Sequence, residues 1–207
     1  MRTEHVNTGD GIRWQRYLWE YGADGRGSLG WSSRATEHLT LYRDGEPVGE
    51  AAGLQARFEV PPGEAGYRLV AEAERGAPAV LGTRVSLAWT FRSASAADGA
   101  VRLPVSVVTF APALDAENAA PAGRLFTVPF SVRPQPGGSA GRPRETTVEV
   151  SYDDGATWAK AEVKGSRVVL RHPAGDGFVS LRARSADLAG NAVEQTVIRA
   201  YRIVTTG

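Results

Sequence analysis

The sequence predicts an all-β protein. Short runs of alternating apolar and polar residues recur between turn-forming residues, and no segment shows a convincing period of 3.6 residues. The chain holds 24 Gly and 12 Pro among its 207 residues, which favours turn-rich structure over helices. The clearest alternation places Val85, Leu87, Trp89 and Phe91 on one face of a strand. A period of two buries one face of a strand in a packed sheet.

In the first half of the chain, aromatic residues and turn signals predict further strands. Asp44-Gly45 lies between two extended segments and is the strongest short-range signal for a β-hairpin. Residues 67–74 alternate in polarity and predict a half-buried strand. Two aromatic strands are expected around the Gly-rich segment 22–27. Their Trp14, Trp19 and Trp31 are a possible ligand platform, but aromatic residues at strand spacing favour a place in the core.

The second half is predicted to contain about seven strands at short spacing. One covers 101–110, and another covers 125–132, where the internal Pro129 indicates a sheet edge or a bulge. The loop 135–143 is rich in Pro and Gly. The remaining strands are expected at 147–151, 161–164, 167–170, 177–185 and 192–202. This spacing is typical of immunoglobulin-like and fibronectin III-like sandwiches.

These strands predict two tandem immunoglobulin-like or fibronectin III-like β-sandwich domains. The first is expected at 1–93 and the second at 100–207, joined by a linker at 94–99. Residues around this linker are small and polar and show no periodicity, which is typical of a connection between domains. Each domain is expected to have a core of its own. The first core centres on the alternating strand at 85–91, and the second on Val148, Val150, Val179, Leu181, Val197 and Ile198.

The composition excludes several kinds of chemistry and partner. A chain without Cys forms no disulfide and no thiolate site. Lys and Arg number 24 against 23 Asp and Glu, and neither half has the positive excess that would neutralise many phosphates, so no nucleic-acid partner is expected. No 18 apolar residues run together and no signal-peptide pattern opens the chain, so we expect neither a membrane span nor a signal peptide in it.

The titratable residues predict no catalytic, metal or cofactor site. His5, His38 and His172 are far apart in the sequence and are expected to be solvated or structural. No Gly-x-Ser-x-Gly elbow is present, and no pair of carboxylates is nominated for a glycosidase.

Residues 187–191, Asp-Leu-Ala-Gly-Asn, could supply oxygen ligands for calcium together with Asp176 or Asp153. The repeating Asp spacing of a calcium loop is missing, however. We therefore expect a tight turn held by Asx hydrogen bonds.

Residues 151–158 follow the pattern Ser-x-Asp-x-Gly-x-Thr-Trp, which resembles the Asp box of sialidases and other propeller proteins. The pattern predicts a hairpin in which Asp153 caps backbone donors, Gly155 takes a positive φ and Trp158 packs beneath the turn. The motif serves folding and not catalysis. Tyr152 and Trp158 are the candidate residues for surface binding of a sugar or a peptide.

Several segments resemble the C-terminal region of large secreted subtilisin-like (S8 family) serine peptidases of actinobacteria. The resemblance covers about 35–203 and rests on segments 67–70, 83–93, 151–158 and 186–201, the last containing Ala-Asp-Leu-Ala-Gly-Asn. The Asp, His and Ser motifs of that family's catalytic triad do not occur in this chain, so no triad residue is carried over.

This resemblance implies a non-catalytic accessory region, extracellular or at the cell surface, that stabilises or positions the enzyme or its protein substrate. The expected partner is the peptidase catalytic domain or that substrate. The alternative is a carbohydrate- or cell-surface-binding module whose aromatic residues stack on a cell-surface glycan.

Overall fold

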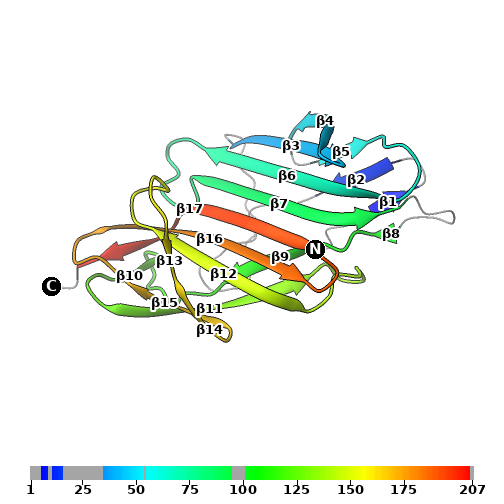
Figure 1. Cartoon of the computed structure of the whole chain (residues 1–207). Helices are drawn as coiled ribbons and strands as arrows, with labels where there is room; N and C mark the ends of the chain where they lie inside the picture. Colours follow the sequence, from blue (N-terminus) through cyan, green and yellow to red (C-terminus); the bar gives the residue numbers. More distant parts are fainter. Residues whose placement is uncertain (1–5, 9–10, 16–34, 54, 95–100, 206–207) are drawn as a thin grey trace.

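The computed structural model describes residues 6–8, 11–15, 35–53, 55–94 and 101–205, and every regular element in them is a β-strand. The predicted all-β fold is confirmed. The strands form one nine-stranded sheet and two four-stranded sheets. In Figure 1 the large sheet extends across the whole molecule, and strands of the smaller sheets lie behind and below it.

The large central sheet combines strands from both halves of the chain. Its order is β13-β12-β16-β17-β7-β6-β3-β4, and a short strand, β10 (Ala119–Pro121), pairs in parallel with one end of β17. In that order the strands are β13 (Ala159–Lys160), β12 (Pro143–Ser151), β16 (Gly177–Asp187), β17 (Ala192–Val204), β7 (Arg84–Ser93), β6 (Ala65–Arg75), β3 (Ala35–Arg43) and β4 (Glu46–Ala52).

Each smaller sheet packs against one half of the central sheet and makes a two-layer sandwich with it. In the first the order is β5 (Gln55–Phe58), β2 (Gly11–Gln15), β1 (Val6–Thr8) and β8 (Val101–Arg102). In the second it is β14 (Glu162–Lys164), β15 (Arg167–Arg171), β11 (Leu125–Pro134) and β9 (Ser106–Phe110). Two layers with an apolar interior are the architecture of immunoglobulin-like and fibronectin III-like sandwiches.

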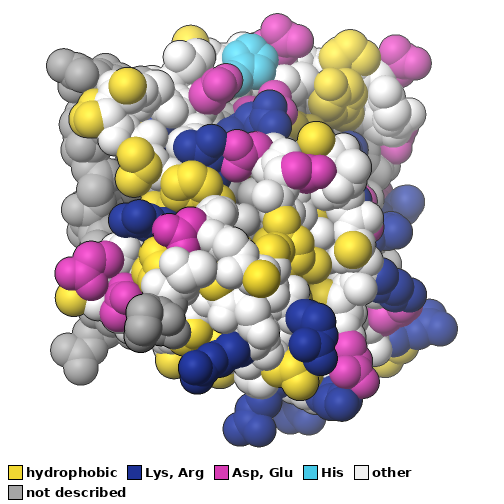
Figure 2. Space-filling view, turned by 90° about the vertical axis from the view of Figure 1, so that its left-hand side faces the viewer, with side chains coloured by type: hydrophobic (Ala, Val, Ile, Leu, Met, Phe, Trp, Pro, Cys, Tyr) yellow, Lys and Arg dark blue, Asp and Glu magenta, His cyan; other side chains and the backbone are white. Residues whose placement is uncertain are grey.

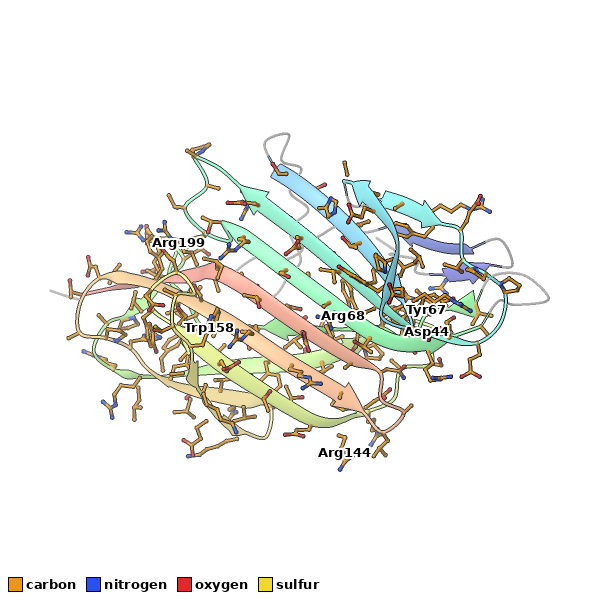
Figure 3. The ribbon with its side chains drawn as sticks, turned by 45° about the horizontal axis from the view of Figure 1, so that its top comes forward. Asp44, Tyr67, Arg68, Arg144, Trp158 and Arg199 are labelled. Atoms are coloured by element: carbon orange, nitrogen blue, oxygen red, sulfur yellow. The ribbon has the colours of Figure 1, made fainter. Side chains whose placement is uncertain are left out.

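Local turn chemistry forms the β3–β4 hairpin. Asp44 and Gly45 have φ values of 51° and 93°, the positive φ pair that an Asp-Gly hairpin turn requires. The Asp44 carboxylate also accepts a 2.9 Å hydrogen bond from the N–H of Gly66 at the start of β6. Figure 3 shows Asp44 beside Tyr67, which lies in the same strand as Gly66. The predicted hairpin is confirmed.

Antiparallel pairing of β7 with β17 joins the two halves. Trp89 faces Val193, Leu87 faces Gln195 and Val85 faces Val197 across this pair. Directly opposed residues of neighbouring strands point to the same side of a sheet. The buried face of β7 therefore continues without a break across β17.

One hydrophobic cluster fills the space between the layers. It includes Leu69 and Leu87 from the first half of the chain and Val108, Val128 and Leu181 from the second. The sequence predicted two separate cores, whereas the structure joins them, because the β7–β17 pair gives both halves a common wall.

Ile198 is a correction to the predicted second core. It is 5% exposed but lies outside the main cluster. Val197 packs against that cluster, so Ile198, the next residue, points to the opposite face of the sheet. A methyl carbon placed on Gly155 would meet the Cδ1 atom of Ile198 at 2.8 Å, so the 151–158 loop covers this side chain.

Two side chains of the β7–β17 pair bind the backbone of β9 in the layer beneath. The amide of Gln195, 1% exposed, donates to the carbonyl oxygen of Val108 at 2.8 Å and accepts from its N–H at 3.3 Å. Trp89 Nε1 donates to the carbonyl oxygen of Ser106 at 2.6 Å. A residue of each half is thus fixed to the same strand of the second sandwich.

The predicted strand at 101–110 is wrong in one respect, because it is two strands. Val101 pairs with Asn7 of β1, in the smaller sheet of the first half, whereas β9 pairs with β11. The predicted linker lies outside the described residues except for Ala94. The division into two domains stays a prediction, which the measurement below tests.

Pro129 lies where β11 changes partner. Residues up to Pro129 pair with β15, and residues from Phe130 onward pair with β9. Proline has no N–H to give to a ladder, so a point of exchange between partners accommodates it.

β17 changes partner at a bulge. Its first part, up to Ile198, pairs with β7, and Arg202 to Val204 pair with β10. Arg199 between them has a φ of 55°, which is uncommon for a residue other than Gly. Its N–H donates to Ser180 Oγ at 3.0 Å, and its carbonyl oxygen accepts from the N–H of Gly82 at 2.8 Å.

We predict that Gln195→Leu lowers the free energy of unfolding by about 1–3 kcal/mol, because the N–H and C=O of Val108 lose their buried partner. Thr196→Val, one residue further on the outer face, is the control and should change little. Differential scanning calorimetry should show one transition that moves as a whole, since both halves share a core. Two transitions, of which only one moves, would instead support two separately folding domains.

Candidate functional site

The loop between β12 and β13 is organised around the carboxylate of Asp153. Its Oδ1 accepts from the N–H of Thr157 at 2.9 Å and from Ser151 Oγ at 2.7 Å, and its Oδ2 accepts from Thr157 Oγ1 at 2.5 Å. These hydrogen bonds, those from Thr157 foremost, lower the pKa of Asp153 to about 2. The prediction that Asp153 caps backbone donors of this loop is confirmed.

Gly155 and Trp158 complete the turn. Gly155 has a φ of 88°, as predicted, and its N–H donates to Ser151 Oγ at 2.8 Å. Trp158 Nε1 donates to the carbonyl oxygen of Gly155 at 3.0 Å, so the indole folds back on the turn. The relation to the Asp box itself still rests on the sequence pattern alone.

An ion pair fastens this loop to the bulge of β17. The guanidinium of Arg199 donates to both oxygens of Asp154, at 2.8 and 2.6 Å. The same guanidinium lies 4.4 Å above the ring of Phe178. Hydrogen bonding from Arg199 lowers the pKa of Asp154 despite the opposing effect of burial. In Figure 3, Arg199 and Trp158 lie at the same end of the central sheet.

The structure does not bring the two candidate binding residues together. Tyr152 is half-buried against the core, donates its hydroxyl to the carbonyl oxygen of Arg171 at 2.9 Å, and has its pKa raised by burial to about 12. Trp158, also half-buried, has the guanidinium of Arg182 at 4.5 Å from its ring. Arg182 belongs to the outer face of the central sheet, so the two aromatic rings lie in different surroundings.

His172 is a buried structural residue, 2% exposed. Its Nδ1 lies 2.8 Å from the carbonyl oxygen of Pro121, which can only accept, so Nδ1 carries the proton. Its Nε2 lies 3.0 Å from the hydroxyl of Tyr201 and accepts from it. Rings of Phe126, Tyr152 and Tyr201 surround the imidazole. Burial lowers the pKa of His172, so it is neutral at pH 7.

Asp187 forms the expected Asx turn. Its Oδ1 accepts from the N–H groups of Ala189 and Asn191, both at 2.9 Å, and its Oδ2 accepts from Asn191 Nδ2 and the N–H of Gly141, both at 2.8 Å. Burial alone would raise its pKa, but these hydrogen bonds outweigh burial and lower it. Asp176 caps Thr205 elsewhere. Among the described residues, no three His, Asp or Glu side chains are grouped to hold a metal ion.

Two other residues that the sequence singled out, His38 and Trp14, lie in described strands. His38 is partly exposed, with Nε2 at 3.8 Å from a carboxylate oxygen of Glu50. Trp14 lies in β2 opposite Ala56. His5, Trp19 and Trp31 fall outside the described residues.

The outer face of the central sheet carries a trough of about 620 Å³ that crosses the β7–β17 junction. Small residues such as Ser86 and Ala88 form part of its lining. Ion pairs bridge the strands beside it: Glu194 binds Arg68 at 3.1 Å and Arg184 at 3.6 Å, and Glu149 binds Arg182 at 2.8 Å. With Glu72, the lining holds three glutamates against three arginines, so the trough offers no net charge to a ligand.

Charges of both signs are mixed on a second side of the molecule as well. Figure 2 shows acidic and basic side chains interspersed with hydrophobic ones, and basic side chains more frequent toward the lower edge of that view. Sequence alternation identified the outward residues of β6 and β7, but it gave no sign that Glu194, more than a hundred residues later, lies beside them.

These features define an all-β sandwich module with a polar, internally paired sheet face. In the described part of the chain neither histidine makes a hydrogen bond with a serine: Nε2 of His38 faces Glu50, and His172 is held by Pro121 and Tyr201. The same part contains no helix long and apolar enough to cross a membrane.

Comparisons with known proteins give structural neighbours of low sequence identity. No family model and no curated protein sequence matches the chain. The fibronectin(III)-like modules of CbhA from Clostridium thermocellum match with 12% identity and a TM-score of 0.30, covering 100% of this chain and 90% of that one. The amphioxus IgVJ-C2 molecule matches with 11% identity and a TM-score of 0.24, covering 96% of this chain and 98% of that one. The strand order and register of the chain itself define its fold.

We predict that Gly155→Val lowers the free energy of unfolding by at least about 1–2 kcal/mol, because a β-carbon is costly at a φ of 88°. It would also meet Ile198 Cδ1 at 2.8 Å. Gly45→Val is the matched control, since Gly45 has a φ of 93° but open space around it. Urea unfolding should show the larger loss at Gly155. Equal losses would mean that contact with Ile198 contributes nothing.

We also predict that acid destabilises the protein through His172. Its folded-state pKa is below the ordinary value of about 6.5, so the unfolded chain binds more protons below that pH. This contribution to stability is complete above about pH 6.5 and is lost as the pH falls toward the folded-state pKa.

Urea unfolding between pH 8 and pH 5 measures this dependence. His172→Gln should flatten it, whereas His38→Gln, which removes a partly exposed imidazole, should retain it. In the native protein, the NMR ring signals of His172 should titrate below pH 6.5. Titration at or above 6.5 would refute the prediction.

Proposed function

We propose that this chain is a non-catalytic β-sandwich module that positions or binds a protein partner. The observation that supports this most is the sheet shared by its two halves. The β7–β17 pair and the hydrogen bonds of Gln195 and Trp89 to β9 give the module one continuous core. A module built in this way transmits a fixed orientation from one end to the other, which is what a positioning role requires.

The use of its polar side chains supports the same proposal. Asp153, Asp176 and Asp187 each hold a loop through several hydrogen bonds, and both ring nitrogens of His172 are occupied. General acid–base catalysis needs a titratable group within reach of a substrate proton. These four groups are instead engaged in maintaining the fold.

The resemblance of 35–203 to the tail of secreted subtilisin-like peptidases makes such an enzyme, or its protein substrate, the partner of this proposal. The module then acts outside the cell or at its surface, where it stabilises the catalytic domain or holds the substrate near it. No residue of this chain takes part in peptide hydrolysis on this view.

Two assays test the proposal. The purified chain should hydrolyse neither casein nor chromogenic peptide and ester substrates, and activity abolished by a serine-directed inhibitor would refute it. Added to the separately produced catalytic domain of an actinobacterial subtilisin-like peptidase, the chain should lengthen that enzyme's half-life at elevated temperature. Trypsin is the control enzyme. An equal effect on both enzymes, or on neither, would remove the peptidase from the proposal.

The alternative, a carbohydrate-binding module, has one observation in its favour. Trp158 lies in a surface loop and is only half-buried, and aromatic side chains of this kind stack on sugars. Arg182 already lies over that ring, however, so a sugar would have to displace it or use the other side. Titration of soluble polysaccharides with intrinsic fluorescence as the readout tests this function. A shift that Trp158→Ala removes would favour it over the positioning role.

A further inference from the structure

One edge of the central sheet is open at β12. This strand pairs with β16 along its whole length, but on its other side only Glu149 and Val150 pair with β13. The N–H of Ala161 donates to the carbonyl oxygen of Val148 at 2.9 Å, just beyond that pair. Residues 143–147 have no second neighbouring strand in the described part of the chain.

The edge is open because the chain crosses from one layer to the other at this point. Lys160 still pairs with Glu149 of β12, but Glu162, two residues later, pairs with Val169 of β15 in the smaller sheet. The diverging segment leaves a hollow of about 470 Å³ beside the edge. Its lining consists of Thr146, Thr147, Val148, Lys160, Ala161, Glu162 and Val163.

The backbone along this edge presents free hydrogen-bonding groups. The carbonyl oxygen of Val148 points away from β16, since it accepts from Ala161. Backbone groups alternate in direction along an antiparallel strand, so the N–H and C=O of Thr146 also point outward. The carbonyl oxygen of Glu145, which accepts from Ser185 Oγ of β16 at 3.3 Å, points inward as this alternation requires.

The charges around the edge favour an acidic occupant. Arg142, Arg144 and Lys160 make no ion pair with any described residue, whereas Glu162 is neutralised by Lys164 at 3.1 Å. Of the carboxylates nearby, Glu149 is paired with Arg182, which leaves Glu145 and Asp187, whose carboxylate accepts from the N–H of Gly141, to oppose the three cations. Figure 3 shows Arg144 at the lower edge of the sheet, with its side chain directed away from the ribbon.

We propose that the β12 edge binds an extended, acidic segment of a partner protein, which adds to the central sheet as a further strand. Main-chain hydrogen bonds to Thr146 supply the attachment, and Arg144 and Lys160 select for carboxylates. This inference deepens the proposed function, and it rests on that function because it takes the partner to be a protein. Pro143, which lacks an N–H, and the bulge at Arg144 limit the added strand to a few residues.

Fluorescence anisotropy with a labelled ten-residue peptide of alternating Glu and Val tests this proposal. The peptide should bind, while the corresponding Lys–Val peptide should not. Methylating alternate backbone nitrogens of the Glu–Val peptide gives two registers, one of which blocks the N–H groups that face β12. Binding should weaken about tenfold or more in that register. Arg144→Glu and Lys160→Glu should each weaken it severalfold. Arg84→Glu, on β7, is the control with the same change of charge and should bind as the native chain does.

A variant of the edge gives an independent measurement. Thr146→Pro removes the outward N–H, and Thr146→Val removes only the hydroxyl that contacts Ser185 Oγ at 2.9 Å. Thr146→Pro should abolish binding and Thr146→Val should preserve it, with circular dichroism as the check of folding. The methylated peptide tests the same hydrogen bonds even if Thr146→Pro does not fold.

Three outcomes would overturn the inference. Equal binding of the Lys–Val peptide would exclude charge selection, and equal binding of both methylated registers would exclude strand addition. If the peptide does not bind and sedimentation analysis shows a dimer that Thr146→Pro converts to monomer, the edge belongs to a second copy of the chain. Hydrolysis of the peptide would instead refute the non-catalytic function, so the two failures are distinguishable.

Discussion

Backbone pairing between β7 and β17 is the interaction on which the rest of the molecule depends. Without it, Trp89 and Gln195 would belong to the edges of two sheets and would need other cover. With it, the two strands lie in the middle of one sheet instead of at two edges, and their apolar faces form one continuous apolar surface. Each smaller sheet then needs only to cover its own part of that surface.

The bulge at Arg199 lets one strand serve two neighbours. A left-handed residue other than Gly costs roughly 1–2 kcal/mol, and several contacts offset this cost at Arg199. Ser180, Gly82 and Asp154 each bond to it, from β16, from the first half of the chain and from the 151–158 loop. The position is therefore a junction where three segments meet, and the loop that covers Ile198 depends on it.

Local features of this fold could be predicted from the sequence, and pairings between distant segments could not. The Asp44-Gly45 turn, the alternation in β7 and the positive φ of Gly155 follow from a few adjacent residues. The sequence of β7 does not indicate which strand pairs with it. The parallel strand β10 escaped prediction because Ala-Ala-Pro has neither alternation nor β-branched residues.

In the candidate site, too, local features could be predicted from the sequence and contacts between distant segments could not. The capping role of Asp153 was predictable because the motif is short and self-contained. The separation of Tyr152 from Trp158 was not, because it depends on His172, which follows β15, and on Arg182 of β16. The outer trough and the open edge arise only where strands from both halves, or both layers, come together.

The position of β17 in the middle of the sheet has a consequence for synthesis of the chain. Between the end of β7 and the start of β17 the ribosome adds about 100 residues, which takes roughly 5–20 s at the usual rates of translation. For that time β7 has an unpaired edge beside a fully apolar face, because its partner does not yet exist. Two nascent chains on neighbouring ribosomes present the same edge to each other. Slow initiation, which spaces the ribosomes, should therefore raise the yield of folded protein.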